Sequence, residues 1–396
     1  MILLITGREK LENKMINYLR QLLKPKYQTL NRLEIDSEAI LYNLNFLQAQ
    51  QPQAVMIPVL KSNAYGHGLK EICSILNQSS VETIAIDSFP EAQIAYRYFR
   101  RRILLIGEMP IAAYRYLNWS RTEVCVYNGE TLKAIASLGV KARIHLFVNS
   151  GMNREGIKNL SAFWQEYKDY LSRVKIVGLC SHLLAAEGDG ESNRRQEKKF
   201  FQDLEFLHQH SCYPVFVHLG NSAGVLALSD NRLNAFRPGL AIYGYNPFTA
   251  ESPHYQRAQN LRPALRLVTT IVSIQSLSSG ETVSYNASYR AERDTKIAVI
   301  PFGYYEGLDR RLSNLASFQL LSANKKISVK LVGQVCMNLS CLDVGNGEEV
   351  GVGSEVVLIS PNRHDFNSLE NLARLQGSTP YELLVKFQAN IRKIIV

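Results

Sequence analysis

From residue 32 onward, short apolar runs rich in β-branched residues alternate with longer stretches in which apolar residues recur at helical spacing. The eight runs before residue 245 cover 54–60, 83–87, 103–107, 122–126, 143–148, 174–180, 213–218 and 235–243. Between them, 90–99 and 192–210 are plausible helices. Strands that alternate with helices pair in parallel, and eight such units close a barrel. The pattern predicts an α/β fold with a (β/α)8 TIM barrel over residues 32–260; an open, doubly wound sheet is the alternative.

After about residue 260 the helical pattern nearly disappears. The remaining apolar segments are short and are separated by turns rich in Gly, Asn and Ser, as expected of strands. These segments are 264–277, 296–302, 327–332 and 354–359. We therefore predict a second, mostly β domain over residues 261–396.

Residues 1–31 differ from the rest of the chain. Apolar side chains recur there at helical spacing, and Lys24-Pro25 ends the pattern. The residues of this apolar face are Leu11, Met15, Tyr18, Leu19, Leu22 and Leu23. We expect a helical N-terminal extension that packs on the main domain or remains from a longer parent chain; an amphipathic helix for a partner or a membrane surface is the alternative.

The formal charge of +10 raises the question of nucleic-acid binding. Lys and Arg are scattered, without interleaved aromatic residues, so we expect no nucleic-acid partner and a basic surface that attracts anionic metabolites. The six cysteines form no CxxC pair and no Cys/His spacing typical of a metal site, which predicts free thiols and no metal. The apolar runs are too short for a signal peptide or a membrane helix, so we expect a cytoplasmic protein without a membrane partner.

Lys61 stands where the first predicted barrel strand ends, in the segment LKSNAYGHG over residues 60–68. Barrel enzymes place their catalytic residues at the carboxyl ends of the strands. Partial desolvation at that edge favours the neutral amine that Schiff-base chemistry requires. A lysine that simply extends into solvent past a strand end would have the same sequence context.

A second group of candidates lies at the ends of the seventh and eighth strands, in HLGNS over 218–222 and RPGL over 237–240. The loops at these two strands often bind phosphate in TIM barrels, through backbone N–H groups and small hydroxyls. A lysine at the first strand and an anion site at the last two are what a phosphorylated aldehyde cofactor needs.

The segment LKSNAYGHG strongly resembles the lysine signature of the bacterial alanine racemases, a family of pyridoxal-phosphate (PLP) enzymes of fold type III whose signature is usually written KADAYGHG. Matching segments follow in the same order from Arg32 to the C-terminus. The resemblance implies a PLP-binding barrel, a C-terminal β domain and a head-to-tail homodimer. It also implies conversion of L-alanine to D-alanine for peptidoglycan in the cell wall.

The resemblance also assigns cofactor contacts. Lys61 would hold PLP as a Schiff base, and Arg237 would face the pyridine nitrogen. An arginine does not give up its proton, so the ring nitrogen would stay neutral and the cofactor would be a weaker electron sink, which leaves proton exchange at Cα as the favoured chemistry. The phosphate contacts that it implies are Tyr65, Ser222, Tyr381 and the backbone of Gly239 and Leu240.

Racemisation needs an acid/base group on each face of Cα. The resemblance gives one face to Lys61 and the other to Tyr285, in VSYNA, which would reach in from the partner subunit. His182 and Arg154 match the residues near that phenol, where positive charge or hydrogen bonds favour the phenolate. The matches to the residues that line the substrate's way in and hold its carboxylate, together with Arg154, are Tyr304 and the partner's Met337.

Several positions depart from the family pattern. Phe147 stands where many members have a lysine, often carbamylated, and Asn149 replaces the aspartate of VDTGMGR, so Arg154 must find another anchor. Asn338 replaces the aspartate of CMDQ, and Asn286 follows Tyr285 where glycine is usual. These departures keep a serine or broad-specificity racemase open as the alternative. A noncatalytic PLP-binding protein is the alternative from another class, although such proteins typically stop after the barrel.

Overall fold

The computed structural model describes residues 29–188, 190–322, 325–346 and 350–396. The extension predicted for residues 1–31 therefore lies almost wholly outside the described residues. No helix in the described parts is long and apolar enough to cross a membrane.

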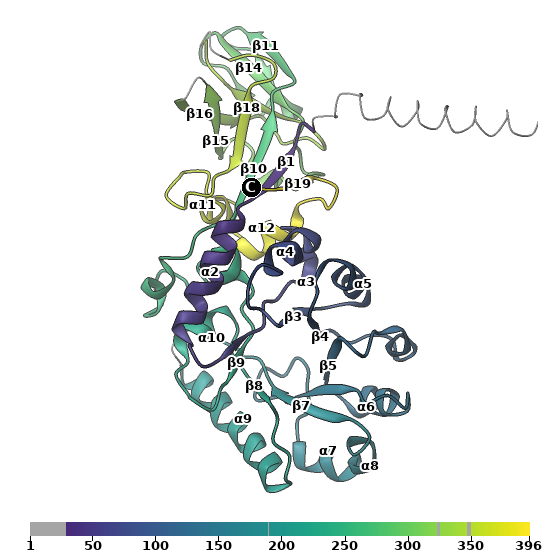
Figure 1. The fold of residues 1–396 in the computed structure, drawn as a ribbon. Coiled ribbons are helices and arrows are strands. Elements are labelled where there is room, and N and C mark those ends of the chain that lie inside the picture. Colours follow the sequence, from purple (N-terminus) through teal and green to yellow (C-terminus); the bar gives the residue numbers. More distant parts are fainter. Residues whose placement is uncertain (1–28, 189, 323–324, 347–349) are drawn as a thin grey trace, which may run out of the picture. The chain divides into compact units, whose positions relative to one another are not determined.

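Eight parallel strands within the described residues form the barrel-like part of the fold (Figure 1). Their bounds are β2 Val55–Met56, β3 Thr83–Ile86, β4 Arg102–Leu105, β5 Thr122–Val126, β6 Arg143–Phe147, β7 Lys175–Cys180, β8 Phe216–His218 and β9 Ala235–Phe236. Strands β3 to β8 pair in chain order, and β2 pairs with β9. A parallel bridge between Val59 and Ala85 joins β2 to β3, and Arg237 N donates to Gly220 O at 2.9 Å between β9 and β8. The predicted barrel fold is confirmed.

Helices cover the outside of these strands. Their bounds are α2 Ser37–Gln50, α3 Lys61–Tyr65, α4 Leu69–Leu76, α5 Phe89–Tyr98, α6 Gly129–Ala136, α7 Leu160–Glu166, α8 Lys168–Leu171, α9 Glu191–Gln209 and α10 Ser222–Ala227, with 3-10 helices η1 Ile111–Tyr116, η2 Leu240–Tyr243 and η3 Tyr255–Ala258. Side-chain caps fix several starts; Asp36 accepts from Ala39 N at 2.9 Å at the start of α2. The helices predicted at 90–99 and 192–210 are found as α5 and α9.

The last predicted barrel strand, 235–243, is wrong in its second half. The strand ends at Phe236, and residues Leu240–Tyr243 form η2. Pro238 has no N–H to donate to a strand ladder, and the N–H groups of Gly239 and Ala241 donate to the Ser222 side chain instead.

Strand β1 and most of the described residues after the barrel form a nine-stranded sheet with the order β11-β14-β17-β16-β15-β18-β10-β1-β19 (Figure 1). Its strands are β1 Arg32–Ile35, β10 Leu265–Thr270, β11 Ser273–Leu277, β14 Thr295–Ile300, β15 Ser317–Ser322, β16 Lys325–Val332, β17 Ser340–Asp343, β18 Glu355–Ile359 and β19 Arg392–Ile395; β12 Thr282–Val283 and β13 Tyr289–Arg290 form a separate pair, with 3-10 helices η4 Tyr285–Ala287 and η5 Arg310–Leu312. Strand β1 pairs antiparallel with β10 and parallel with β19, so the sheet includes residues from before the barrel. The β-rich second part is confirmed, whereas the boundaries at 31/32 and 260/261 stay predictions.

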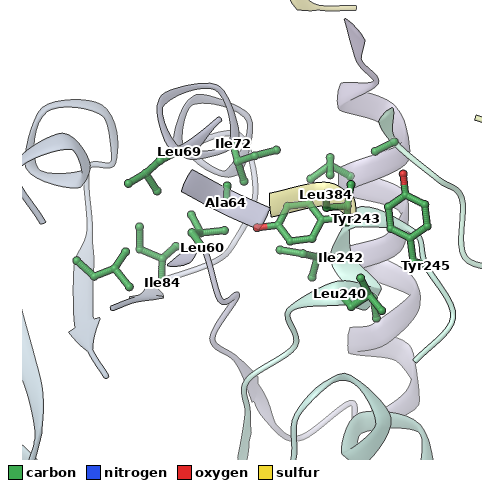
Figure 2. Close-up of a cluster of buried hydrophobic side chains, with 14 of the residues drawn as sticks. Leu60, Ala64, Leu69, Ile72, Ile84, Leu240, Ile242, Tyr243, Tyr245 and Leu384 are labelled. Atoms are coloured by element: carbon green, nitrogen blue, oxygen red, sulfur yellow. The ribbon is translucent and has the colours of Figure 1, made fainter. Parts of the chain in front are cut away.

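Two helices interrupt the region where the sequence pattern predicts almost none: α11, Leu369–Leu375, and α12, Pro380–Lys386. Thr379 caps α12, and Pro380 opens it. Figure 2 shows Leu384 of α12 packed beside Ala64 and Tyr243 in the buried core at the barrel. This contact brings α12, and with it Tyr381, to the end of the first barrel strand.

Candidate active site

A cavity of about 780 Å³ opens at the carboxyl ends of the barrel strands. Its walls come from the loops that follow the strands and from α12. The sequence-predicted site residues that line it are Lys61, Tyr65, Arg154, His182, Ser222, Arg237, Gly239, Leu240 and Tyr381. The fold thus brings together residues that are up to 320 positions apart in the chain.

The three other predicted site residues do not line this cavity in the described chain. In the β-rich part, Tyr285 begins η4 while Tyr304 and Met337 lie in loops, and the three residues are 66%, 47% and 56% exposed.

Lys61 begins a turn of unusual backbone. The next four residues, Ser62 to Tyr65, have φ values of 55, 55, 54 and 52°, so they form one left-handed helical turn without any glycine. Such a conformation costs roughly 1–2 kcal/mol per residue. Two side chains contribute to holding the turn: Asn63 N donates to Glu91 Oε1 at 3.2 Å, and Leu69 N donates to Asn63 Oδ1 at 2.9 Å. The turn places the side chains of Lys61 and Tyr65 in the same cavity.

The side chain of His67 holds the backbone of this turn. Its ring is fully buried and stacks on Tyr243, with 4.3 Å between the ring centroids. Because Nδ1 lies 3.2 Å from Ala64 O and 3.0 Å from Tyr65 O, and both are acceptors, Nδ1 carries the proton and donates. Burial lowers the pKa of His67 to about 4. His67 is therefore a neutral residue that positions the turn and does not face the cavity.

A group of neutral donors lines the same cavity as Lys61. Ser222 Oγ accepts from Gly239 N at 2.9 Å and from Ala241 N at 3.1 Å, so its own hydrogen is free to donate. Burial, with a smaller effect of the Asp87 charge, raises the pKa of Tyr65 to about 12, and burial also raises the pKa of Tyr381. Both phenols stay protonated, and hydroxyl donors of this kind suit a phosphate group.

Gly239 is required for this arrangement. A Cβ at that position would lie 2.5 Å from Tyr65 Oη, well inside contact distance. The backbone thus approaches the phenol as closely as it does only because residue 239 has no side chain, and the space that it leaves belongs to the cavity.

Arg237 lies inside the barrel at the base of the cavity and is 6% exposed. Its NH1 group donates to His218 O at 2.9 Å and to His218 Nδ1, and NH2 donates to Ser181 O at 2.5 Å. Burial and then the positive charges of Arg237, Arg154 and Lys61 lower the pKa of His182 to about 3, so His182 is neutral in the cavity wall.

Phe147 occupies the position at which many members of the resembled family have a lysine, often carbamylated. Phe147 is 7% exposed and packs on Tyr127, with 4.6 Å between the ring centroids. Arg154 pairs with Glu155 instead, with Nε donating to Oε1 at 3.0 Å. Asn149 keeps the preceding turn by accepting from Gly151 N at 3.0 Å and from Asn153 N at 3.1 Å. Glu155 is thus the residue that anchors the Arg154 guanidinium in place of that lysine.

The other two departures also have a local explanation. Asn286 has φ 59°, a left-handed conformation that asparagine adopts more readily than most residues, so the glycine can be replaced without a new loop shape. Asn338 Nδ2 donates to Glu306 Oε1 at 2.9 Å, and Glu306 Oε2 accepts from Gly303 N at 2.8 Å. These bonds tie the segments that carry Tyr304 and Met337 to each other.

The sequence reasoning missed several acidic residues in the cavity wall. Asp87 and Glu108 stand just beyond β3 and β4, Glu187 follows β7, and Glu382 lies on α12. The signal was present for the first two, because each is a charged residue directly beyond a buried parallel strand. The position of Glu382 depends on the packing of α12, which no local pattern indicates.

Two family models match the chain, one described as alanine racemase, N-terminal domain, over residues 35–247, and one as alanine racemase, C-terminal domain, over residues 264–395. An alanine racemase of Borreliella burgdorferi is 30% identical over 365 residues, which cover 90% of this chain and 92% of the relative.

Solved structures share the fold. Alanine racemase from Bacillus anthracis, solved with bound L-Ala-P, is 26% identical, with a TM-score of 0.82 over 94% of this chain and 96% of that one. Alanine racemase from Bartonella henselae, solved with covalently bound pyridoxal phosphate, has a TM-score of 0.79 over 93% of this chain and 100% of that one; at 23% identity it shows the fold alone. With both family models matched in order across most of its length, this chain belongs to the alanine racemase family.

Proposed function

We propose that the protein is an alanine racemase, an isomerase that interconverts L-alanine and D-alanine with PLP, in the cytoplasm, and that supplies D-alanine for peptidoglycan. The observation that carries the proposal is the meeting of Lys61, Arg237 and the Ser222–Gly239 donors in one cavity. Family membership supports the same conclusion.

The donor set fits PLP. Lys61 would hold the aldehyde carbon, Arg237 would face the pyridine nitrogen, and the phosphate would take hydrogen bonds from Ser222, Tyr65 and Tyr381 and from the backbone of Gly239 and Leu240. Donors from neutral hydroxyls and backbone amides satisfy a phosphate without placing a lysine near it. When bound, PLP withdraws electrons from the Cα of an attached amino acid and makes its proton acidic.

The residues of this chain then direct the reaction. Arg237 is always charged and can only donate, so it keeps a proton off the pyridine nitrogen and restrains the electron demand at Cα. With PLP bound, the Lys61 amine would remove or return the Cα proton on one face. Arg154 and the partner's Met337 would bind the substrate carboxylate, the partner's Tyr304 would line the way in, and neutral His182 offers a hydrogen bond near the second base.

The second base is Tyr285 of the partner subunit. In the described chain Tyr285, Tyr304 and Met337 are exposed and away from the cavity. A head-to-tail homodimer would set these side chains over the cavity of the other copy, and two identical contacts would close the assembly. The proposed dimer also explains why the cavity of one chain is open.

The first test follows deuterium uptake and chirality together. The protein, saturated with PLP, is incubated in D2O with L-alanine, L-serine or L-arginine. Rapid formation of Cα-deuterated D-alanine with little product from the others supports the alanine assignment. Faster turnover of serine or arginine would instead identify a serine or broad-specificity racemase. Phe147 and Asn338, which depart from the family pattern, are the residues that favour this alternative. No exchange with any of the three, with PLP bound at Lys61, contradicts the racemase and favours a noncatalytic PLP-binding protein.

The second test separates the two bases and tests the dimer. Lys61→Ala and Tyr285→Phe are each expected to abolish racemisation, because each leaves one face of Cα without its base, and Tyr285→Phe should still bind PLP. When the two inactive variants are unfolded, mixed and refolded together, half of the dimers pair one of each, and each mixed dimer has one intact site. Recovery of about a quarter of the wild-type activity is expected for a shared site. No recovery places both bases in one chain and refutes the proposed dimer.

A further inference from the structure

Four buried polar side chains cross the inside of the barrel in one unbroken line of hydrogen bonds. Glu123 of β5 accepts from His145 Nε2 at 2.9 Å, His145 Nδ1 lies 2.7 Å from His218 Nε2, and His218 Nδ1 accepts from Arg237 NH1. Glu123, His145 and His218 are fully buried. Burying polar groups at this depth costs free energy of folding unless each has a hydrogen-bond partner. We therefore treat the four side chains as one hydrogen-bonded network.

The direction of every bond in this line follows from Arg237. A guanidinium has donors only, so His218 Nδ1 must be the acceptor and cannot carry a proton. A neutral imidazole then has its proton on Nε2, and His218 Nε2 donates to His145 Nδ1. By the same reasoning His145 Nε2 carries a proton and donates to the Glu123 carboxylate.

The charges agree with this assignment. Burial and then the Arg237 charge lower the pKa of His218, and burial lowers the pKa of His145 against the attraction of Glu123. Burial acts to raise the pKa of Glu123, but hydrogen bonds from His145 and Arg143 outweigh it and lower that pKa. A cation at one end and an anion at the other thus enclose two neutral rings.

The backbone makes room for the line. A Cβ on Gly178 of β7 would lie 2.0 Å from His145 Nδ1, the atom that accepts from His218. At the far end, Arg143 Nε donates to Glu123 Oε1 at 2.6 Å, and Arg143 is the first residue of β6. The line therefore runs from the amino ends of the strands to Arg237 at the base of the cavity.

Arg237 uses three donors in its bonds to His218 and Ser181. A guanidinium has five in a planar fork, so fixing these three fixes the orientation of the other two. We propose that Glu123, His145 and His218 form a relay of positioning residues that orients Arg237 toward the pyridine nitrogen of the cofactor. The part that concerns the cofactor rests on the proposed function; the tautomers and the orientation of Arg237 do not.

The relay itself is tested by 15N NMR of the protein labelled at histidine, with and without PLP. Signals are assigned by comparison with His145→Asn and His218→Asn. Both rings should be neutral with the proton on Nε2 from pH 6 to 8. A proton on Nδ1 of either ring, or a charged ring, overturns the proposal. This measurement needs neither activity nor cofactor, so it stands even if the racemase assignment fails.

The effect on the cofactor is tested with Glu123→Gln in the PLP-saturated protein. Removing the negative charge of Glu123 should change the 15N chemical shift of the pyridine nitrogen of labelled PLP. The kcat value should fall about tenfold or more, with KM for alanine nearly unchanged. The matched control is Glu130→Gln on the surface of α6, which should change neither. An unchanged pyridine shift and kcat in folded Glu123→Gln overturn the proposal.

Gly178→Ala provides a second perturbation that removes no polar group. Its Cβ should displace the His145 ring, so the His145 and His218 signals and the pyridine shift should move as in Glu123→Gln. Gly188→Ala, whose Cβ would meet nothing nearer than 3.7 Å, is the control. Unmoved signals in folded Gly178→Ala contradict the relay.

Discussion

His67 gives the structure a specific sensitivity to acid. Its fully buried ring donates from Nδ1 to two backbone carbonyls, and burial lowers its pKa to about 4, against 6.5 for an exposed histidine. Between these two values the unfolded chain binds a proton that the folded chain does not. Stability contributed by the neutral ring is therefore complete above pH 6.5 and declines as the pH falls toward 4.

The size of the effect follows from the two pKa values. Each pH unit within this window is worth about 1.4 kcal/mol of unfolding free energy for one group. Between pH 7 and pH 4.5, protonation of the unfolded chain at His67 should cost the fold about 2 kcal/mol. A loss of this size is a considerable fraction of the stability of an ordinary domain.

The perturbation that isolates this term is His67→Asn. The asparagine Nδ2 can take the place of the Nδ1 donor toward Ala64 and Tyr65, but it does not titrate. Loss of the stack on Tyr243 should cost about 1 kcal/mol at every pH, so it cancels from the comparison. All other titrating groups are shared by the two proteins and cancel as well.

The assay is guanidinium unfolding followed by tryptophan fluorescence at pH 7 and pH 4.5. The wild type should lose about 2 kcal/mol more than His67→Asn when the pH is lowered. His210→Asn is the matched control, because His210 lies on the surface and water reaches the ring in both states. Equal losses in the wild type and in His67→Asn would refute the reasoning and show that the buried ring accepts a proton in the folded protein.

Three further changes have defined outcomes. Gly239→Ala places a Cβ 2.5 Å from Tyr65 Oη and should weaken PLP binding on the order of tenfold, measured by titration of the cofactor absorbance; an unchanged affinity contradicts the close approach. Phe147→Ala should lower the free energy of unfolding by about 3–5 kcal/mol, with Phe147→Leu much closer to the wild type, as urea unfolding can show. Asn338→Asp restores the family residue but removes the Nδ2 donor and sets a carboxylate against Glu306, so it should lower kcat for alanine. A variant as active as the wild type would show that this bond has no functional role.

The barrel strands could be predicted because a strand that is buried on both faces has an unbroken run of apolar residues in its sequence. For that reason the runs at 122–126 and 174–180 fall within one residue of β5 and β7. The same signal fails at 235–243, where Pro238 and the Ser222 hydroxyl divert the backbone. It fails again at α11 and α12, whose apolar faces are too short to establish a period.

Some of the site residues could likewise be predicted from the sequence, and others could not. Residues directly after apolar runs, such as Lys61, could be placed at the cavity from the sequence. The left-handed turn after Lys61 could not, because its residues have no glycine to indicate it. Glu123 and His145 could not be paired either, because they meet only when the barrel closes. Tyr285 is matched by its motif, but it does not line the cavity of the described chain.

Strand β1 makes the barrel an insertion within another folding unit. Residues 32–35 pair with β10 on one side and with β19 on the other, so the sheet joins three segments separated by most of the chain. One cut between residues 247 and 264 would therefore leave a C-terminal fragment that lacks an inner strand, with two unpaired edges available for aggregation. During translation the sheet can be completed only after residues 392–395 emerge, long after the barrel has been made. Because Ile35 and Leu265 are partners in the antiparallel pair of β1 and β10, a fragment meant to fold alone could regain its inner strand through a short turn that joins these two residues in place of the barrel.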